Sequence, residues 1–333
     1  MTQTRRDLLK RAAVFGSAAL FAPAVLSTGR SFGQSQFPNR TVRIVVPFPA
    51  GATTDLLARL IANRLSDTMG QSFVVENVGG GGGSIGADQV AKAQADGHTL
   101  LFGNITFTTT TSSLMFVKRA RHTFDDFVPV SVGAWVPLLF LAAKDVPVGN
   151  LKEFVDYAKR SPTPLLYGST GPGSIMNLCG EVLKRDAGIK MDHVPFRGAA
   201  PLVTDMLAGR IQFGGDQLSS SLQHVRSGLL KAMAVATKSA ALPETPTARQ
   251  MGYPNLELQG WNGFLAPKGT PAEIVNRIQQ QVAEAVKRPD IAKRMTDVGA
   301  EPSGNTPAEM DMMLREQIAQ VRPVVEELKL VVE

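Results

Sequence analysis

Cysteine is almost absent from this chain, and aromatic residues are few. Cys179 is the only cysteine among 333 residues, and aromatic residues make up 6% of the sequence. A single cysteine excludes an internal disulfide, so stability must come from packing of the apolar residues, which make up 44% of the chain. Cys179 shares an apolar pattern with Ile175 and Val182, which predicts a buried small residue; a nucleophilic thiol is the alternative.

Sequence motifs of two enzyme classes are missing as well. The chain has no H-E-x-x-H sequence of zinc peptidases and no G-K-[ST] sequence of phosphate-binding loops. Its four histidines, His98, His122, His193 and His224, have no metal-ligand spacing. We therefore predict no metal, no cofactor and no enzymatic activity. The enzymatic alternative is a hydrolase with Ser174 as nucleophile and His193 as base.

Basic residues only slightly outnumber acidic residues. The 35 Lys and Arg residues and 29 Asp and Glu residues give a net charge of +6. Residues 1–33 hold five of the basic residues and one acidic residue, so the remainder has 30 against 28 and a net charge of +2. Without a basic excess or a long charged tail, the chain does not have the charge pattern of a nucleic-acid-binding protein.

The first 33 residues have the layout of a signal peptide. Arg5 and Arg6 precede an uncharged apolar stretch at residues 12–28, and residues 31–33 (Ser-Phe-Gly) offer a cleavage site. We predict export to the periplasm by the twin-arginine route, with the general route as the alternative. A membrane anchor is the less favoured interpretation, because a serine and a proline interrupt the apolar stretch.

Short β-branched runs alternate with helical patterns in two successive sets. This alternation predicts parallel sheets with helices on their faces, in two α/β lobes. The C-terminal part is expected to be helical and to return to the first lobe, because Thr270 and Thr306 each open a capping box with proline at the first helical position. The predicted strands are residues 41–46, 73–75, 99–102, 136–142, 165–167, 193–195, 211–213 and 232–235, and the predicted helices of the two sets are 56–65, 84–95, 151–159, 174–184 and 201–207.

Small and hydroxyl residues follow several of these strands. In open α/β sheets the carboxyl ends of the strands share one edge, where ligands bind. The first turn of a helix offers unpaired N–H groups and partial positive charge, which suit a carboxylate. In the first such loop, Thr53 or Thr54 is expected to cap the following helix. Ordinary capped turns are the alternative for the loops at residues 47–55, 103–106, 169–174, 196–201 and 214–217.

A glycine run at residues 79–83 continues into a G-x-G-x-x-G pattern. The run fits this pattern in several registers, and no suitable acidic residue at a strand end follows. We interpret it as a flexible or tightly turned connection and not as a nucleotide site.

Taken in order along the chain, these segments resemble the receptors of tripartite tricarboxylate transporters, the Bug family. The similarity covers nearly the whole chain after residue 33. It is carried by residues 46–55 (VPFPAGATTD), 75–77 (VEN) with the glycine run, 85–87 (IGA), 96–100 (DGHTL), 124–130 (FDDFVPV), 171–174 (GPGS) and 193–198 (HVPFRG). The chain departs from the family at Ala52, where a glycine is usual, in the glycine run, and in the threonine-rich stretch 105–113, so the ligand stays open.

The resemblance implies a type II-like periplasmic-binding-protein fold with a ligand cleft between the lobes. It implies a monomer that delivers a small carboxylate (a di- or tricarboxylate, an aromatic carboxylate or an acidic amino acid) to an inner-membrane tripartite tricarboxylate carrier. Alternatives are a signalling partner without transport, or another type of transporter. The expected parts are a signal peptide at 1–33, lobe 1 at 34–135 with 258–333, and lobe 2 at 136–257.

The family's ligand-contacting loops map onto defined positions of this sequence. Together with the polar Asn104 after the third predicted strand, they give the expected site residues Phe48, Ala50, Gly51, Thr53, Thr54, Asp55, Asn104, Ser169, Thr170, Ser174, Gly198, Ala199 and Asp216. A carboxylate beside a bound carboxylate costs energy. Asp55 is therefore expected to stabilise its helix, whereas Asp216 either faces away or receives an ammonium group of an acidic amino acid. Arg197 is expected at the surface, with a ligand carboxylate as the alternative partner.

Overall fold

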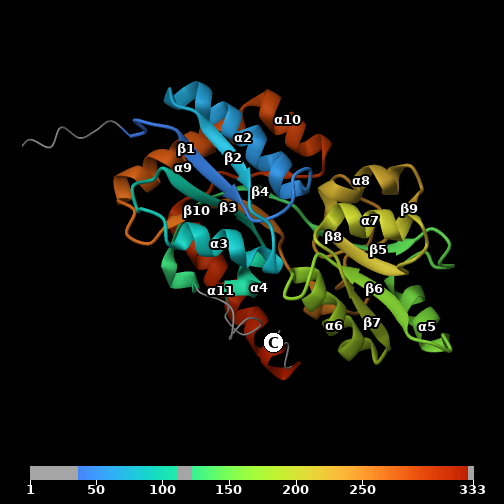
Figure 1. Ribbon diagram of the computed structural model, residues 1–333. Coiled ribbons are helices and arrows are strands. Elements are labelled where there is room, and N and C mark those ends of the chain that lie inside the picture. Colours follow the sequence, from blue (N-terminus) through green and yellow to red (C-terminus); the bar gives the residue numbers. More distant parts are fainter. Residues whose placement is uncertain (1–36, 112–121, 329–333) are drawn as a thin grey trace, which may run out of the picture. The chain divides into compact units, whose positions relative to one another are not determined.

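The computed structural model describes residues 37–111 and 122–328, which form two mixed β-sheets flanked by helices (Figure 1). The predicted signal peptide lies outside the described residues. The helices are α2 (Thr53–Met69), α3 (Ser84–Ala91), α4 (Thr106–Thr111), α5 (Leu151–Arg160), α6 (Ile175–Ala187), α7 (Ala199–Leu207), α8 (Leu218–Arg226), α9 (Ala272–Lys287), α10 (Pro289–Asp297) and α11 (Pro307–Glu327), with short 3-10 turns η1 (Gly81–Gly83), η2 (Phe124–Asp126) and η3 (Pro254–Leu256).

The first sheet has the strand order β11-β4-β10-β3-β1-β2. Strand β1 pairs in parallel with β2 and β3, whereas β10 is antiparallel to both of its neighbours, β3 and β4. Helices α9 and α11 pack against β4, so the C-terminal helices return to this sheet. The strands are β1 (Val42–Val46), β2 (Phe73–Asn77), β3 (Thr99–Asn104), β4 (Phe127–Trp135), β10 (Trp261–Pro267) and β11 (Glu301–Pro302).

The second sheet repeats this arrangement, with the order β7-β6-β8-β5-β9. Strand β6 pairs in parallel with β7 and β8, and β5 is antiparallel to β8 and β9. In each sheet, the strand that directly follows a crossing from the other sheet, β10 or β5, is antiparallel to both of its neighbours. The strands are β5 (Leu138–Ala143), β6 (Leu165–Ser169), β7 (Met191–Pro195), β8 (Phe213–Gln217) and β9 (Leu230–Val235). The lobe boundaries given in the sequence analysis, at residues 135/136 and 257/258, stay a prediction.

The chain passes between the sheets at two adjacent crossings, residues 136–137 and residues 257–260. The amide of Val136 donates to the carbonyl of Gly260 over 2.9 Å. A Cβ atom on Gly260 would lie 1.9 Å from the Val136 carbonyl oxygen, so only glycine allows this approach. Beside the crossings, Asn262 donates to Gln217 over 3.0 Å, which links β10 of one sheet to β8 of the other.

Several local predictions were wrong. Helix α9 begins at Ala272 with Pro271 as its N-cap, and the Thr270 hydroxyl donates to Pro267 instead of capping the helix. The second capping box does form, between Thr306 and Glu309. The C-terminal part is not purely helical, because the buried run 261–267 completes the first sheet as β10. Residues 214–217, predicted as a loop, are the end of β8.

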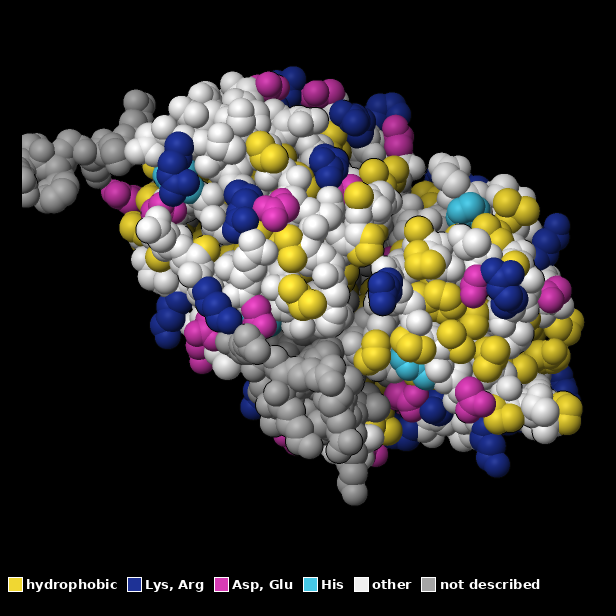
Figure 2. All heavy atoms as spheres, in the orientation of Figure 1, with side chains coloured by type: hydrophobic (Ala, Val, Ile, Leu, Met, Phe, Trp, Pro, Cys, Tyr) yellow, Lys and Arg dark blue, Asp and Glu magenta, His cyan; other side chains and the backbone are white. Residues whose placement is uncertain are grey.

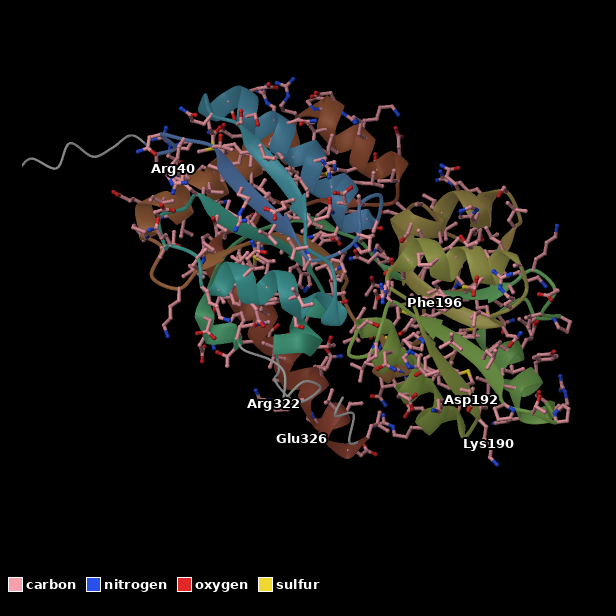
Figure 3. All side chains as sticks on the ribbon, viewed as in Figure 1. Arg40, Lys190, Asp192, Phe196, Arg322 and Glu326 are labelled. Atoms are coloured by element: carbon pink, nitrogen blue, oxygen red, sulfur yellow. The ribbon has the colours of Figure 1, made fainter. Side chains whose placement is uncertain are left out.

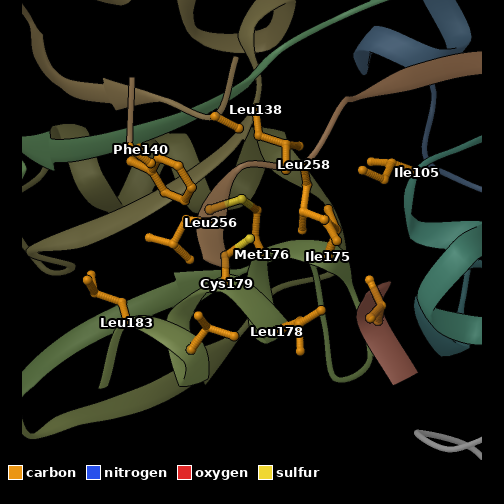
Figure 4. Packing of buried hydrophobic residues seen from close by; sticks show 14 of the residues in the cluster. Ile105, Leu138, Phe140, Ile175, Met176, Leu178, Cys179, Leu183, Leu256 and Leu258 are labelled. Atoms are coloured by element: carbon orange, nitrogen blue, oxygen red, sulfur yellow. The ribbon is translucent and has the colours of Figure 1, made fainter. Parts of the chain in front are cut away.

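Buried apolar residues form two clusters, and each cluster has members from both sheets. Figure 4 shows part of one cluster, in which Cys179 lies close to Met176 and Leu183 on α6. Cys179 is 1% exposed, and burial raises the pKa of its thiol to about 12. The thiol is therefore protonated at neutral pH, which supports the packing interpretation over the nucleophilic one.

Candidate functional site

A pocket lies between the first and second sheets, at the carboxyl ends of β1, β3, β6, β7 and β8. The free volume between its walls is about 20 Å³, room for about one water molecule. Its walls are small, apolar or hydroxyl residues apart from two amides and one carboxyl group. The lining residues are Phe48, Pro49, Ala52, Thr53, Thr54, Asn104, Thr106, Thr170, Gly198, Ala199, Asp216 and Gln217.

The first wall is the start of helix α2. Its N-cap is Ala52, which has no side chain to cap the helix, so the prediction that Thr53 or Thr54 caps it was wrong. Both threonines are instead buried in the first turn, where backbone N–H groups have no acceptor within the helix. The Thr54 hydroxyl accepts a hydrogen bond of 2.9 Å from the Asn104 amide, whose oxygen accepts from the Thr106 N–H over 2.9 Å. These bonds hold the hydroxyl wall in place.

Asp55 lies in the same turn of α2 but does not line the pocket. Its carboxylate accepts hydrogen bonds from the Gly51 N–H at 2.9 Å, from Asn77 at 2.9 Å and from the Arg59 guanidinium at 3.0 Å. Burial by itself raises the pKa of Asp55, but the hydrogen bonds from Arg59, Gly51 and Asn77 outweigh it and leave the pKa below its usual value. Asp55 thus ties the first loop to α2 and β2, as the helix-stabilising interpretation expected.

The second wall is the start of helix α7. Gly198 is its N-cap with φ of 126°, a conformation that side chains other than glycine rarely adopt. A Cβ atom there would lie 3.1 Å from the Pro49 ring, so the two sides of the pocket come too close here to leave room for a side chain. Thr170, from the loop after β6, and Ala199 complete this wall. In Figure 3, Lys190 and Phe196 mark opposite ends of β7, and Phe196 leads into Gly198.

The end of β8 supplies the one ionisable side chain among the lining residues. The Asp216 carboxylate accepts a hydrogen bond of 3.0 Å from Ser220, and the Ser220 hydroxyl also contacts the Thr53 hydroxyl at 3.2 Å. Burial raises the pKa of Asp216 to about 6, because the hydrogen bonds from the Gln217 backbone and Ser220 oppose burial only in part. Asp216 therefore titrates close to the physiological range.

The raised pKa of Asp216 predicts a pH-dependent stability. The folded chain holds this proton more tightly than the unfolded chain, so this contribution to stability is present below about pH 4 and is lost as pH rises through about 6. We expect Asp216→Asn to gain about 2 kcal/mol relative to the wild type between pH 4.5 and pH 8, at about 1.4 kcal/mol per pKa unit. Urea unfolding at both pH values measures this difference. Asp205→Asn, an acid of α7 outside the pocket, should show no such gain.

Two serines expected in the site are occupied elsewhere. Ser174 is fully buried and caps α6 by accepting from the Asn177 N–H at 3.3 Å. Ser169 is fully buried and contacts the His193 ring at 2.7 Å. The base of the hydrolase alternative is therefore paired with Ser169 and not with Ser174. Burial lowers the pKa of His193, with Glu181 opposing this shift only in part.

Eight of the thirteen expected residues line the pocket: Phe48, Thr53, Thr54, Asn104, Thr170, Gly198, Ala199 and Asp216. Ala50, Gly51, Asp55, Ser169 and Ser174 belong to the same loops and helix starts but do not line it. Sequence reasoning missed Pro49, Ala52, Thr106 and Gln217. All four lie in the loops predicted at residues 47–55, 103–106 and 214–217, so whole loops would have been the better unit of prediction.

No Lys, Arg or His belongs to the lining residues. Arg197, one residue before Gly198, is exposed, as expected. Figure 2 shows basic and acidic side chains interspersed over the face that it presents, without a continuous patch of one sign. The electrostatic field in the pocket therefore comes from helix starts and one carboxyl group. Within residues 37–111 and 122–328, no three Asp, Glu, His or Cys residues are grouped so that they could hold a metal ion, and no helix has the length and apolar character to span a membrane.

The chain is similar to known proteins over most of its length. Residues 57–330 match the model of the family described as "Tripartite tricarboxylate transporter family receptor". Protein BugT of Bordetella pertussis is 30% identical over 293 residues, which cover 87% of this chain and 90% of that relative.

Two solved structures from Rhodopseudomonas palustris are similar in both sequence and fold. Rpa4515 with adipate is 36% identical with a TM-score of 0.82, over 88% of this chain and 98% of that one. MatC with bound malate is 33% identical with a TM-score of 0.80, over 87% of this chain and 100% of that one.

Proposed function

Because the chain belongs to the receptor family of tripartite tricarboxylate transporters, we propose that it captures a small carboxylate in the pocket between its two sheets. The chain is a solute-binding receptor of the Bug type. We propose in addition that its ligand is a small carboxylate and that it delivers this ligand to a membrane carrier. The carboxylate class is supported by the adipate and the malate in the two related structures, and the coupling to a carrier by the description of the family.

The start of α2 is the observation that carries this proposal. The N–H groups of the first turn lack acceptors within the helix, and the hydroxyl groups of Thr53 and Thr54 lie beside them at the pocket wall. A carboxylate there would gain hydrogen bonds and the favourable end of the helix dipole. The start of α7 at Gly198 and Ala199 offers a second such end across the pocket.

A ligand can enter the pocket only if the two sides of the pocket separate. About 20 Å³ of free volume holds about one water molecule, whereas a dicarboxylate has several heavy atoms. Pro49 and Gly198 lie close together across the pocket, and within the described residues the chain crosses between the sheets twice. We propose opening about these crossings and closure on the ligand, a hinge movement in which a few residues absorb the change.

The proposed setting is the periplasm, after removal of residues 1–33, with delivery to an inner-membrane carrier. A signalling partner without transport remains the alternative. We propose no catalysis, and this is supported by the fully buried Ser174 that caps α6. Sequencing the N-terminus of the protein from the periplasmic fraction tests export; an N-terminus that still contains Arg5 and Arg6 would contradict it.

A thermal-shift screen tests the carboxylate proposal. The panel contains mono-, di- and tricarboxylates including adipate and malate, acidic amino acids and neutral analogues. A ligand at 100 times its Kd that binds only the folded state adds about 2.7 kcal/mol of stability, which should raise Tm by about 5–10 °C. No shift with any carboxylate, in protein shown to be free of bound ligand, would contradict the proposal.

Thr53→Val locates the binding site. Valine has nearly the shape of threonine but lacks the hydroxyl group, so the affinity for the ligand found in the screen should fall by at least about tenfold. Thr68→Val, at an exposed position of the same helix, is the matched control. Equal loss in both variants would place the binding site elsewhere.

A further inference from the structure

The charges around the pocket are unusual for an anion-binding site. Among its twelve lining residues the single ionisable side chain is Asp216, which is itself acidic. Asp216 forms no ion pair with any residue in the described part of the chain. An anionic ligand group placed against it would meet repulsion without compensation.

Asp216 nevertheless has unused capacity as a hydrogen-bond acceptor. An ionised carboxylate has about four lone-pair directions. One is used by the Ser220 hydroxyl at 3.0 Å, and the backbone of Gln217 supplies another hydrogen bond. A donor group on the ligand would satisfy a remaining direction and would reduce the penalty of leaving a partly buried carboxylate unpaired.

The position of Asp216 limits where that donor lies on the ligand. Thr53 and Asp216 are joined through Ser220 by contacts of 3.2 and 3.0 Å, so Thr53 Oγ1 and Asp216 Oδ2 are separated by at most about 6 Å. A ligand that places its carboxylate at the start of α2 therefore reaches Asp216 with a group on the neighbouring carbon.

We propose that Asp216 is a specificity-determining residue that accepts a hydrogen bond from the 2-hydroxyl or 2-ammonium group of the ligand. The pocket then selects 2-hydroxy- or 2-amino-carboxylates over the same carboxylates without the donor. This inference rests on the proposed carboxylate-binding function and narrows its ligand class.

The test compares three four-carbon ligands that differ at one carbon: succinate, L-malate and L-aspartate. Isothermal titration of the full chain at pH 8 should give a Kd for malate or aspartate at least tenfold below that for succinate, and the tighter of the two identifies the donor. Asp216→Ala, which removes the acceptor, should reduce this ratio to less than threefold. Asp205→Asn removes the same charge from α7 outside the pocket, at an acid paired with Arg210, and should keep the wild-type ratio.

The outcomes separate this inference from the function on which it rests. If the wild type binds succinate as tightly as malate and aspartate, or if Asp216→Ala keeps the wild-type ratio, Asp216 does not select the donor while the receptor function stands. If no carboxylate in the wider panel binds, the proposed function itself fails. Asp216→Leu, which also lacks an acceptor, provides a second variant should Asp216→Ala lack the circular dichroism and melting behaviour of a folded protein.

Discussion

Replacing Gly260 with alanine is expected to destabilise the protein by about 4 kcal/mol and to lower Tm by about 10 °C. The new Cβ would lie 1.9 Å from the Val136 carbonyl oxygen and 3.1 Å from its carbon, and backbone atoms cannot turn away as a side chain can. The two crossings must separate, which strains the 2.9 Å hydrogen bond from Val136 to Gly260. Thermal and urea unfolding measure the loss.

Gly103→Ala is the matched control for this substitution. Gly103 is also buried, in β3 next to β10, but a Cβ there would meet its nearest atoms at 3.7 Å, an ordinary contact. Its substitution should change stability by less than about 1 kcal/mol. If both variants melt within about 2 °C of the wild type, the close approach of the crossings does not require glycine at position 260.

Asp55→Ala is expected to cost about 3 kcal/mol at pH 7. The substitution removes the acceptor of the Gly51 N–H and one hydrogen-bond partner each of Asn77 and Arg59. A hydrogen bond to a charged group contributes about 1.5–3 kcal/mol. Asp67→Ala, on the same helix with a 70% exposed side chain, should cost less than about 0.5 kcal/mol.

The pH dependence of this loss has a definite sign. The pKa of Asp55 is lowered by folding, so its contribution is present above the unfolded value of 3.8 and is lost as pH falls through the lower folded value. The difference between wild type and Asp55→Ala should therefore be constant from pH 8 to about 5 and decrease below pH 4. A difference that grows on acidification would show that Asp55 does not act as an ionised acceptor.

The parallel strands of each sheet and most site loops could be predicted from sequence because the signals are local. Alternation of β-branched and helical runs predicts parallel strands, and parallel strands bring their carboxyl ends to one edge. This reasoning placed Thr53, Thr170 and Gly198 in loops that do meet at the pocket. It did not predict β4 or β10, which pair antiparallel to each other and make the first sheet mixed. Strand β10 is buried throughout, and its sequence lacks the alternation of apolar and polar residues that indicates a strand.

The sequence by itself shows that small and hydroxyl residues follow the strands, because this pattern involves only residues that are neighbours in the chain. The segments concerned are residues 47–55, 169–174 and 196–201. Only the tertiary structure decided which of them face the pocket, because each side chain turns toward the partner that satisfies it. Asp55 turns to Asn77, 22 residues away, and Ser169 turns to His193, 24 residues away. Gly260 is required because Val136, distant in sequence, passes within contact of it. Hydrogen-bond satisfaction and close packing are properties of the folded chain and cannot be read from local sequence.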